Sequence, residues 1–226
     1  MSHFDPDSLR FFRDLARHNE RAWFHANKAR YEAKVRDPFL RLIGELAEPL
    51  ARISPNFRAD PRPIGGSLFR IQRDTRFAND KTPYKTWAGA RFFHERGRQV
   101  EAPLFYLQIA PGDSFVAAGL WRPSSPTLRR LRDFLIDNPA AWKRAVHAPA
   151  FRRRFELGGE SLTRPPRGFD PAHELIEDLK RKDFVVLRRL DDVLVTGPKL
   201  RATVAEEFAR MGPLVDYLCA ALELEF

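Results

Sequence analysis

The chain has 226 residues, 43% of them hydrophobic and 31% charged, which is typical of a soluble globular protein large enough for a sizeable core. No apolar run is long enough to span a membrane, and the N-terminus lacks the basic and apolar regions of a signal peptide. The single cysteine, Cys219, excludes an internal disulfide. We therefore expect a cytoplasmic protein of one domain without a membrane partner.

The charge of the chain is unevenly distributed. There are 39 Lys and Arg side chains against 30 Asp and Glu, a net charge of +9. The excess lies in two basic segments, residues 58–98 at +6 and residues 122–167 at +7, whereas residues 168–226 sum to −4. A GC-rich genome explains why Arg outnumbers Lys, but it does not explain why the charge is segregated. The segregation favours an acidic ligand or partner.

The N-terminal part, about residues 1–52, is predicted to be helical because its apolar side chains recur every three to four positions. Asp5 is placed to cap the first helix and Asn19 the second, while Asp37 precedes a proline that restarts or kinks the chain. A loop rich in Pro and Gly, residues 53–67, then marks a change of structure type.

The remaining mixed part, about residues 66–226, alternates strands with helices. Period-2 patterns and short apolar runs predict strands at 68–73, 88–93, 104–110, 115–121, 184–190 and 193–195. Pro111–Ser114 is typical of a tight turn, so the strands on either side of it should be antiparallel. Helices are expected to begin near Ser125, Asn138, Asp170 and Thr196, the last of them ending or kinking at Gly212–Pro213. This order predicts an α+β fold with N-terminal helices, a central antiparallel sheet packed by helices, and a C-terminal helix.

Motifs of the common enzyme classes are missing from the chain. There is no Gly-x-x-x-x-Gly-Lys-Ser/Thr loop, no Gly-x-Gly-x-x-Gly and no Gly-x-Ser-x-Gly, which removes the usual signatures of nucleotide binding and of hydrolases. The six histidines have no metal-ligand spacing, and one cysteine cannot form a redox pair. We therefore predict no cofactor and no metal site.

The most informative stretch runs from Phe69 to Phe93 and is rich in Arg and Lys. If residues 69–75 are extended, Arg70 and Asp74 project from the same face, where the carboxylate would hold guanidinium groups for a bidentate contact with phosphate or carboxylate. The predicted ligand-binding residues are Arg70, Arg73, Asp74, Arg76, Lys81, Tyr84 and Lys85, with Trp121 as a roof. Turnover is left open: Asp74 or Asp80 would be the general base and Tyr84 a proton donor.

Three alternatives remain beside a small-molecule site. The same Arg–Asp pairs could brace a loop, because such pairs are common on sheets and do no chemistry. A nucleic-acid-binding module would use both basic segments, 58–98 and 122–167, and residues 151–155 form a dense basic run within the second. An interaction protein with no active site would pair its acidic C-terminal part with the basic segments of another copy.

Three stretches carry a resemblance to a known family: FRIQRDTRFANDKTPYKTWAGARF, LFYLQIAPGDSFVAAGLWRPSSPTLRRLRDFL and LKRKDFVVLRRL. Between about Phe4 and Leu222 the chain resembles the family called domain of unknown function 2461. The resemblance implies a single domain found in bacteria and fungi, and it implies no activity, because the family has no established catalytic or binding residues. A histidine often stands in that family where this chain has Gln108, so a mechanism that used the histidine would not carry over.

Overall fold

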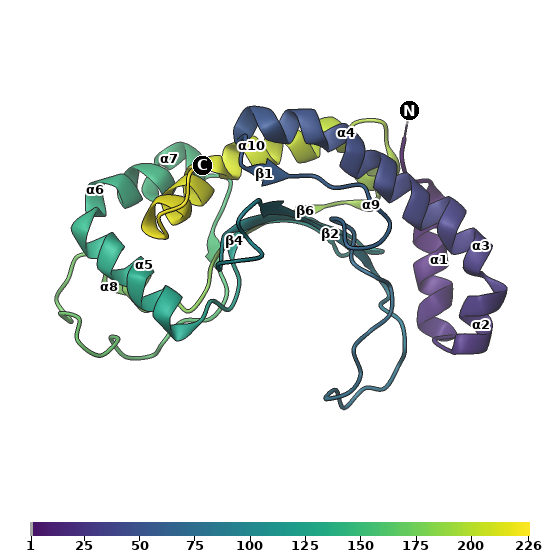
Figure 1. Cartoon of the computed structure of the whole chain (residues 1–226), viewed down its shortest axis with the longest axis horizontal. Coiled ribbons are helices and arrows are strands. Elements are labelled where there is room, and N and C mark those ends of the chain that lie inside the picture. The colour runs from purple at the N-terminus through teal and green to yellow at the C-terminus, as the bar shows by residue number, and fades with distance from the viewer. Residues whose placement is uncertain (1) are drawn as a thin grey trace.

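A computed structural model describes residues 2–226 and shows an arch with a sheet at its centre (Figure 1). The sheet is antiparallel and six-stranded, in the order β1-β2-β3-β4-β6-β5. Its strands are β1 Phe57–Arg58, β2 Ala88–His94, β3 Leu104–Ile109, β4 Ser114–Leu120, β5 Leu157–Gly158 and β6 Phe184–Leu190. The strands predicted at 88–93, 104–110, 115–121 and 184–190 are confirmed, as is the antiparallel pairing of β3 with β4.

Helices cover one face of the sheet and extend past it on both sides (Figure 1). The two longest, α4 Asp37–Ile53 and α10 Leu200–Ala221, pack against each other, and α10 also packs on β3 and β4. The N-terminal group comprises α1 Pro6–Arg17, α2 Arg21–Ala26, α3 Lys28–Tyr31 and the π-helical turn η1 Glu32–Arg36. The group on the other side comprises α5 Ser125–Asp137, α6 Pro139–Trp142, the π-helical turn η2 Lys143–His147, α7 Pro149–Arg152 and α8 Ile176–Leu179. The predicted α+β architecture is therefore confirmed.

The first two helices differ in how well their starts could be predicted. Asp5 accepts a hydrogen bond from the backbone N–H of Ser8 (2.9 Å), and the Ser8 hydroxyl accepts one from the N–H of Asp5 (3.1 Å), so the predicted cap is confirmed. Asn19 does not cap α2. Its amide donates to the backbone carbonyl of Tyr84 (2.9 Å) and accepts from the Tyr84 N–H (3.0 Å), which joins two segments that are 65 residues apart.

Residues 68–73 are extended but do not form a strand of the sheet, contrary to the prediction. Leu68 forms a single bridge with Ala90 of β2, and Gln72 forms one with Tyr84. The Phe69 N–H still donates to the carbonyl of Gly89 on β2, and from Ile71 onward the chain pairs with its own returning limb. The alternation in the sequence therefore indicates an exposed hairpin, because a two-stranded ribbon alternates polar and apolar side chains as a sheet strand does.

The strand predicted at 193–195 is also wrong, because these residues lie in the short helix α9 Asp192–Thr196. Asp191 accepts a hydrogen bond from the Leu194 N–H (2.7 Å) and so caps the helix. Three apolar residues with high β-propensity are outweighed by this local bond and by the burial of Val195.

The last two predicted helices differ from expectation in opposite directions. The helix expected from Asp170 is reduced to α8, because the Asp170 carboxylate accepts a hydrogen bond from the Ala172 N–H (2.8 Å) and closes a turn that competes with a helix start. The helix α10 is longer than expected, because it continues through Pro213, where the sequence predicts an end or a kink.

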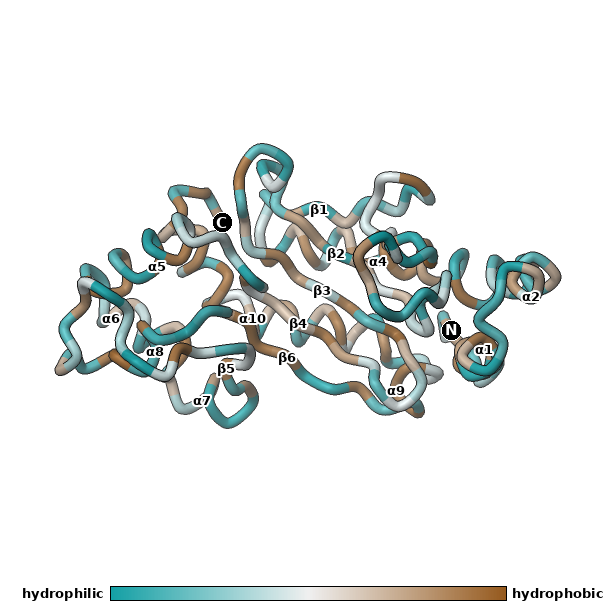
Figure 2. Tube along the Cα trace, turned by 90° about the horizontal axis from the view of Figure 1, so that it is seen from below, coloured by the Kyte–Doolittle hydropathy of each residue, from teal (hydrophilic) through white to brown (hydrophobic). Residues whose placement is uncertain are grey.

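The two faces of the sheet are not equivalent. On β3, Phe105 and Leu107 are fully buried toward α10, where the Phe208 ring lies 5.0 Å from the Phe105 ring. Their neighbours Leu104 and Tyr106 point to the opposite face and are only partly buried. Figure 2 looks onto this second face, which is not packed against α4 or α10. We call it the open face.

Candidate functional site

The basic stretch of the sequence forms a hairpin that projects from the open side of the sheet (Figure 1). Its limbs are joined by a backbone hydrogen bond in which the Lys85 N–H donates to the carbonyl of Ile71 (2.8 Å). At its base the Tyr84 ring is buried and stacks on Phe24 of α2, with ring centroids 4.2 Å apart. We call residues 70–86 the basic hairpin.

Most charges of the basic hairpin are paired with one another. Arg73 donates to Asp80 and Thr82. Arg76 donates to Asp74 at 2.7 and 3.0 Å. The N–H of Thr82, followed by the Arg73 guanidinium, lowers the pKa of Asp80 to about 2, and Arg76 lowers the pKa of Asp74. Carboxylates with lowered pKa values are weak bases at neutral pH, so this pairing favours bracing over proton abstraction.

Lys85 is different, because it has no carboxylate partner among residues 2–226. Its ammonium donates to the backbone carbonyls of Arg70 (2.5 Å) and Gln72 (3.0 Å) and lies 5.5 Å from the centre of the Trp87 ring. Burial, followed by the charges of Arg70 and Arg73, lowers the pKa of Lys85. An anion beside it would stabilise this half-buried cation and oppose that shift.

The basic hairpin forms part of a polar pocket of about 450 Å³. The predicted site residues that line it are Arg73, Asp74, Asp80, Tyr84 and Lys85. Those that lie on the same hairpin without lining the pocket are Arg70, Arg76 and Lys81. Asn19, which anchors Tyr84, is also part of the lining and was not singled out as a site residue from the sequence.

Trp121 lies apart from the polar pocket and is not its roof. It follows the end of β4, which the strand register puts level with the end of β2 at Phe93. The basic hairpin leads into the start of β2 at Ala88. The five residue steps between Ala88 and Phe93 span about 17 Å of strand, and this separation depends on pairings that sequence alone does not reveal.

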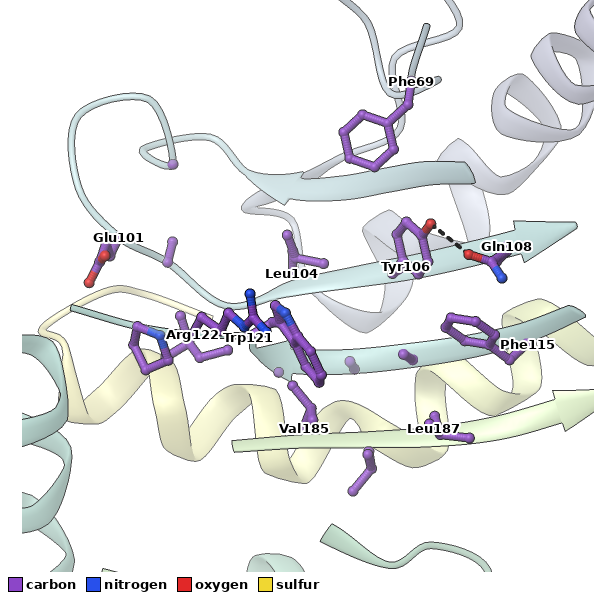
Figure 3. A pocket seen from close by; sticks show the side chains of 18 of the residues that line it. Phe69, Glu101, Leu104, Tyr106, Gln108, Phe115, Trp121, Arg122, Val185 and Leu187 are labelled. Carbon is purple, nitrogen blue, oxygen red and sulfur yellow. Dashed lines mark hydrogen bonds between the residues drawn. The ribbon is translucent and has the colours of Figure 1, made fainter. Parts of the chain in front are cut away.

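A larger cavity of about 990 Å³ occupies the open face of the sheet (Figure 3). Phe115, Trp121 and Leu187 contribute apolar surface to it, and Trp121 and Leu187 remain 62% and 45% exposed. Ala117 and Gly119 on β4 add little volume to its floor, which leaves the hollow deep. We call it the open-face cavity.

Two polar side chains of β3 lie on the floor of the open-face cavity (Figure 3). The Tyr106 hydroxyl donates to Oε1 of Gln108 (3.3 Å), and Nε2 of Gln108 donates to the backbone carbonyl of Asp113 (3.2 Å). Burial raises the pKa of Tyr106 above its usual value of 10, so its hydroxyl stays neutral at physiological pH. The pair therefore offers hydrogen bonds in the strand-built part of the cavity, which is otherwise apolar.

Trp87 belongs to both hollows, since its side chain lines the polar pocket and the open-face cavity. One part of its ring lies beneath the Lys85 ammonium. Its Cζ3 atom is 2.8 Å from the point that a Cβ at Gly89 would occupy, and the same point is 2.3 Å from the Tyr106 hydroxyl oxygen. A single indole thus connects the cation of the basic hairpin with the polar pair of the sheet.

The sequence pattern of one protein family runs through most of this chain. The family described as "Conserved hypothetical protein (DUF2461)" matches residues 7–217. The chain belongs to this family. Comparisons with curated proteins and with solved structures found no match. Membership in DUF2461 confirms the predicted resemblance, and because the family description names no activity, a ligand has to be inferred from the geometry.

Two general features of the DUF2461 chain concern metal ions and membranes. Within residues 2–226 no group of three or more His, Cys, Asp or Glu side chains is arranged to hold a metal ion. Over the same range none of the helices combines the length and the apolar character needed to cross a membrane.

The sequence indicated the basic segment of the hairpin but not the open-face cavity. The available signal was the apolar character of β3 and β4 on both faces, at Leu104 and Phe115 as well as on the buried side.

Proposed function

We propose that this DUF2461 protein binds an amphipathic small molecule. Its carboxylate or phosphate would be held in the polar pocket by Lys85, and its apolar body would lie in the open-face cavity. The observation that carries the proposal is that Trp87 lines both hollows, so one ligand can occupy the two together. The sequence predicts a ligand with a phosphate or carboxylate group, and the proposed ligand has an apolar part in addition.

The size and lining of the open-face cavity support an apolar body. Ligand pockets commonly enclose about 300 to 1,000 Å³ and are lined by aromatic and aliphatic side chains with a few polar groups. The cavity has about 990 Å³, and its exposed Trp121 and Leu187 are side chains that a ligand would cover. Each Å² of apolar surface removed from water contributes about 25 cal/mol, so an alkyl or aryl group gains free energy there.

Cations without a carboxylate partner support the anionic group. Lys85 has only backbone acceptors, and the neighbouring Arg70 is exposed and makes no ion pair in the described part of the chain. Arg73, by contrast, is already held by Asp80. A carboxylate or phosphate that accepts a hydrogen bond from Lys85 would form a charge-assisted bond, typically about 1.5–3 kcal/mol.

The proposal is one of binding in the cytoplasm, with no reaction assigned. The lowered pKa values of Asp74 and Asp80 argue against either as a general base at neutral pH. Cys219 is a buried free thiol, which is compatible with a reducing compartment.

The nucleic-acid and scaffold alternatives stay predictions. Several cations of the two basic segments are already paired with carboxylates of the same chain, such as Arg58 with Glu95 and Arg129 with Asp133. This pairing leaves fewer free cations for a phosphate backbone than the number of Lys and Arg side chains in these segments suggests. We prefer small-molecule binding because Trp87 lines both the open-face cavity and the polar pocket in which Lys85 lies.

The test is competition binding with the dye 8-anilinonaphthalene-1-sulfonate, which combines an aromatic body with a sulfonate. Octanoate and octanol serve as competitors, because they share an alkyl chain and differ in charge. We expect the dye to bind, and octanoate to displace it at about tenfold lower concentration than octanol, since 1.4 kcal/mol corresponds to about tenfold. Equal displacement by both competitors would contradict the anion site. Absence of dye and octanoate binding would contradict the whole proposal.

Variants locate the binding on the protein. Lys85→Ala should weaken octanoate about tenfold and octanol much less, whereas Phe115→Ala should weaken both competitors. Lys199→Ala is the matched control, because Lys199 is exposed and lines neither hollow. If Lys199→Ala weakened octanoate as much as Lys85→Ala does, the anion would be attracted by the general positive charge and not by the polar pocket.

A further inference from the structure

We propose that Tyr106 and Gln108 form a specificity site in the open-face cavity that recognises a hydroxyl group on the apolar body of the ligand. The inference rests on the proposed function, which supplies the anionic group and the apolar body. It narrows the ligand to the class of hydroxylated amphipathic acids or phosphate esters.

The polar pair is isolated within the strand-built part of the cavity. Among the residues of β3, β4 and β6 that line it, Tyr106 and Gln108 have polar side chains, and the others are apolar or glycine. They stand two positions apart on β3, so both project from the open face (Figure 3). An apolar ligand body lying across β3 would cover both of them.

The hydrogen bonds of the pair leave a defined set of partners unfilled. The backbone carbonyl of Asp113 can only accept, so it faces Nε2 of Gln108, and this turns Oε1 toward Tyr106. Oε1 can also only accept, so the Tyr106 hydroxyl is the donor. A lone pair on the hydroxyl oxygen, a second lone pair on Oε1 and the second hydrogen of Nε2 remain. A hydroxyl group fits this set, because it can donate and accept at once.

Gly89 provides the space in which the Tyr106 hydroxyl lies. It is paired with Gln108 across β2 and β3. A Cβ at this position would lie 2.3 Å from the Tyr106 hydroxyl oxygen and 2.8 Å from the Trp87 ring, both well inside van der Waals contact. The missing side chain therefore allows the hydroxyl to approach the indole on which Lys85 also lies.

The position of Trp87 predicts where the ligand carries its hydroxyl. The anion partner Lys85 and the hydroxyl partner Tyr106 both adjoin this one side chain, whereas Trp121 lies at the other end of the strands, about 17 Å away along β2. A hydroxyl at an interior carbon of the chain can reach the polar pair while the anionic group is bound.

Selectivity follows from the cost of covering polar atoms without a partner. A plain alkyl chain would displace water from the unbonded lone pairs of Tyr106 and Gln108. It has no hydrogen-bonding group to offer in place of that water. A hydroxylated chain restores the lost bond. Sites built in this way reject the analogue that lacks the polar group, because their own polar groups would be left unpaired.

The test compares octanoate with octanoates that carry one hydroxyl at successive carbons, in the same dye-displacement assay. Wild type, Tyr106→Phe and Gln108→Met are used: the first variant keeps the ring, and the second keeps the length of the side chain. For the wild type we expect at least one of the hydroxylated octanoates to bind three- to tenfold more tightly than octanoate. The gain, taken as the ratio of the two affinities within each protein, should disappear in both variants.

Octanoate itself separates this inference from the proposed function. If octanoate binds the wild type and no hydroxylated acid binds more tightly, the specificity site is overturned and the proposed function stands. A gain that persists in both variants would also overturn the site, because the hydroxyl would then be recognised elsewhere. If octanoate fails to bind the wild type, the proposed function and the inference fall together. Thermal unfolding of each variant establishes that it is folded before its ratio is used.

Discussion

The covered face and the open face of the sheet are built from the same strands, yet they have different partners. On the covered face the rings of Phe92 and Phe105 lie 5.1 and 5.0 Å from that of Phe208 on α10, and all three are buried. On the open face Phe115 is partly buried and Leu187 is 45% exposed, around a cavity of about 990 Å³. Both faces are apolar. The difference is that one is filled by the protein itself, which leaves the other available to a ligand.

Two cations of the basic hairpin, Arg73 and Lys85, differ in the same way: the protein itself binds one, and the other can bind a ligand. Arg73 is held by Asp80 and Thr82, so its charge is used within the basic hairpin. Lys85, twelve residues further along the chain, has only backbone carbonyls as acceptors within residues 2–226. A cation that is bound to a carboxylate stabilises the fold, whereas a cation without a carboxylate partner can bind an additional anion.

The largest expected effect separates the two faces directly. Phe208→Ala should lower the free energy of unfolding by about 3–5 kcal/mol, because its ring is buried and its removal leaves a cavity in the packed layer. Phe115→Ala makes the same chemical change on the open face, where the ring is partly exposed, and should cost less than about 1.5 kcal/mol. Urea denaturation of both variants measures the difference. Equal losses would show that the open face is packed in solution as tightly as the covered one.

A second variant tests the close approach of β4 to β6 in the sheet. Gly119 has a φ of +126°, and a Cβ there would lie 1.9 Å from the carbonyl oxygen of Phe184 on the neighbouring strand β6. Strain in this backbone region costs about 1–3 kcal/mol for other residues, and the contact with backbone adds to it, so Gly119→Ala should cost about 2–4 kcal/mol.

The matched control for this variant is Gly112→Ala in the turn between β3 and β4. Its φ is +69°, and nothing lies within 4 Å of the added Cβ, so only the backbone strain of about 1 kcal/mol is expected. Urea denaturation again gives the comparison. If the two variants were destabilised equally, the close approach of β4 to β6 would make no contribution of its own.

Sequence analysis could predict what depends on neighbouring residues and missed what depends on distant ones. The strands β2, β3, β4 and β6 follow from local alternation, and the cap at Asp5 follows from a residue three positions away. Asn19 bonds to the backbone of Tyr84, 65 residues further on, and no local pattern indicates that partner. The segment 68–73 alternates like a strand, but its pairing is decided by the limb that returns from the hairpin.

The candidate site shows the same division. The basic hairpin could be predicted as a unit because its charges lie close together in sequence and pair with one another. Trp121 could not be placed, since its distance from the hairpin depends on the register of three strands. The apolar residues Leu104 and Phe115 are compatible with a covering helix or with a ligand, and only the course of α4 and α10 on the other face distinguishes the two.

The smallest expected effect concerns the pH dependence of binding at Lys85. Burial, followed by Arg70 and Arg73, lowers the pKa of Lys85 below its ordinary value of 10.5. The ammonium is therefore lost at a lower pH than that of an exposed lysine, and octanoate affinity should fall as the pH rises through this lowered pKa. Lys85→Arg should keep its affinity over the same range, because a guanidinium remains protonated.

The sign of the proton exchange gives an independent measurement of the same event. A bound carboxylate favours the ammonium form and raises the pKa of Lys85, so near the lowered pKa the wild type should take up protons when octanoate binds. Calorimetry in two buffers of different ionisation enthalpy measures this uptake, and Lys85→Arg should show none. If both proteins had the same pH profile and the same proton exchange, Lys85 would not hold the carboxylate. The anion would then have to be bound by another cation, such as the exposed Arg70, and the contrast between Arg73 and Lys85 would carry no functional meaning.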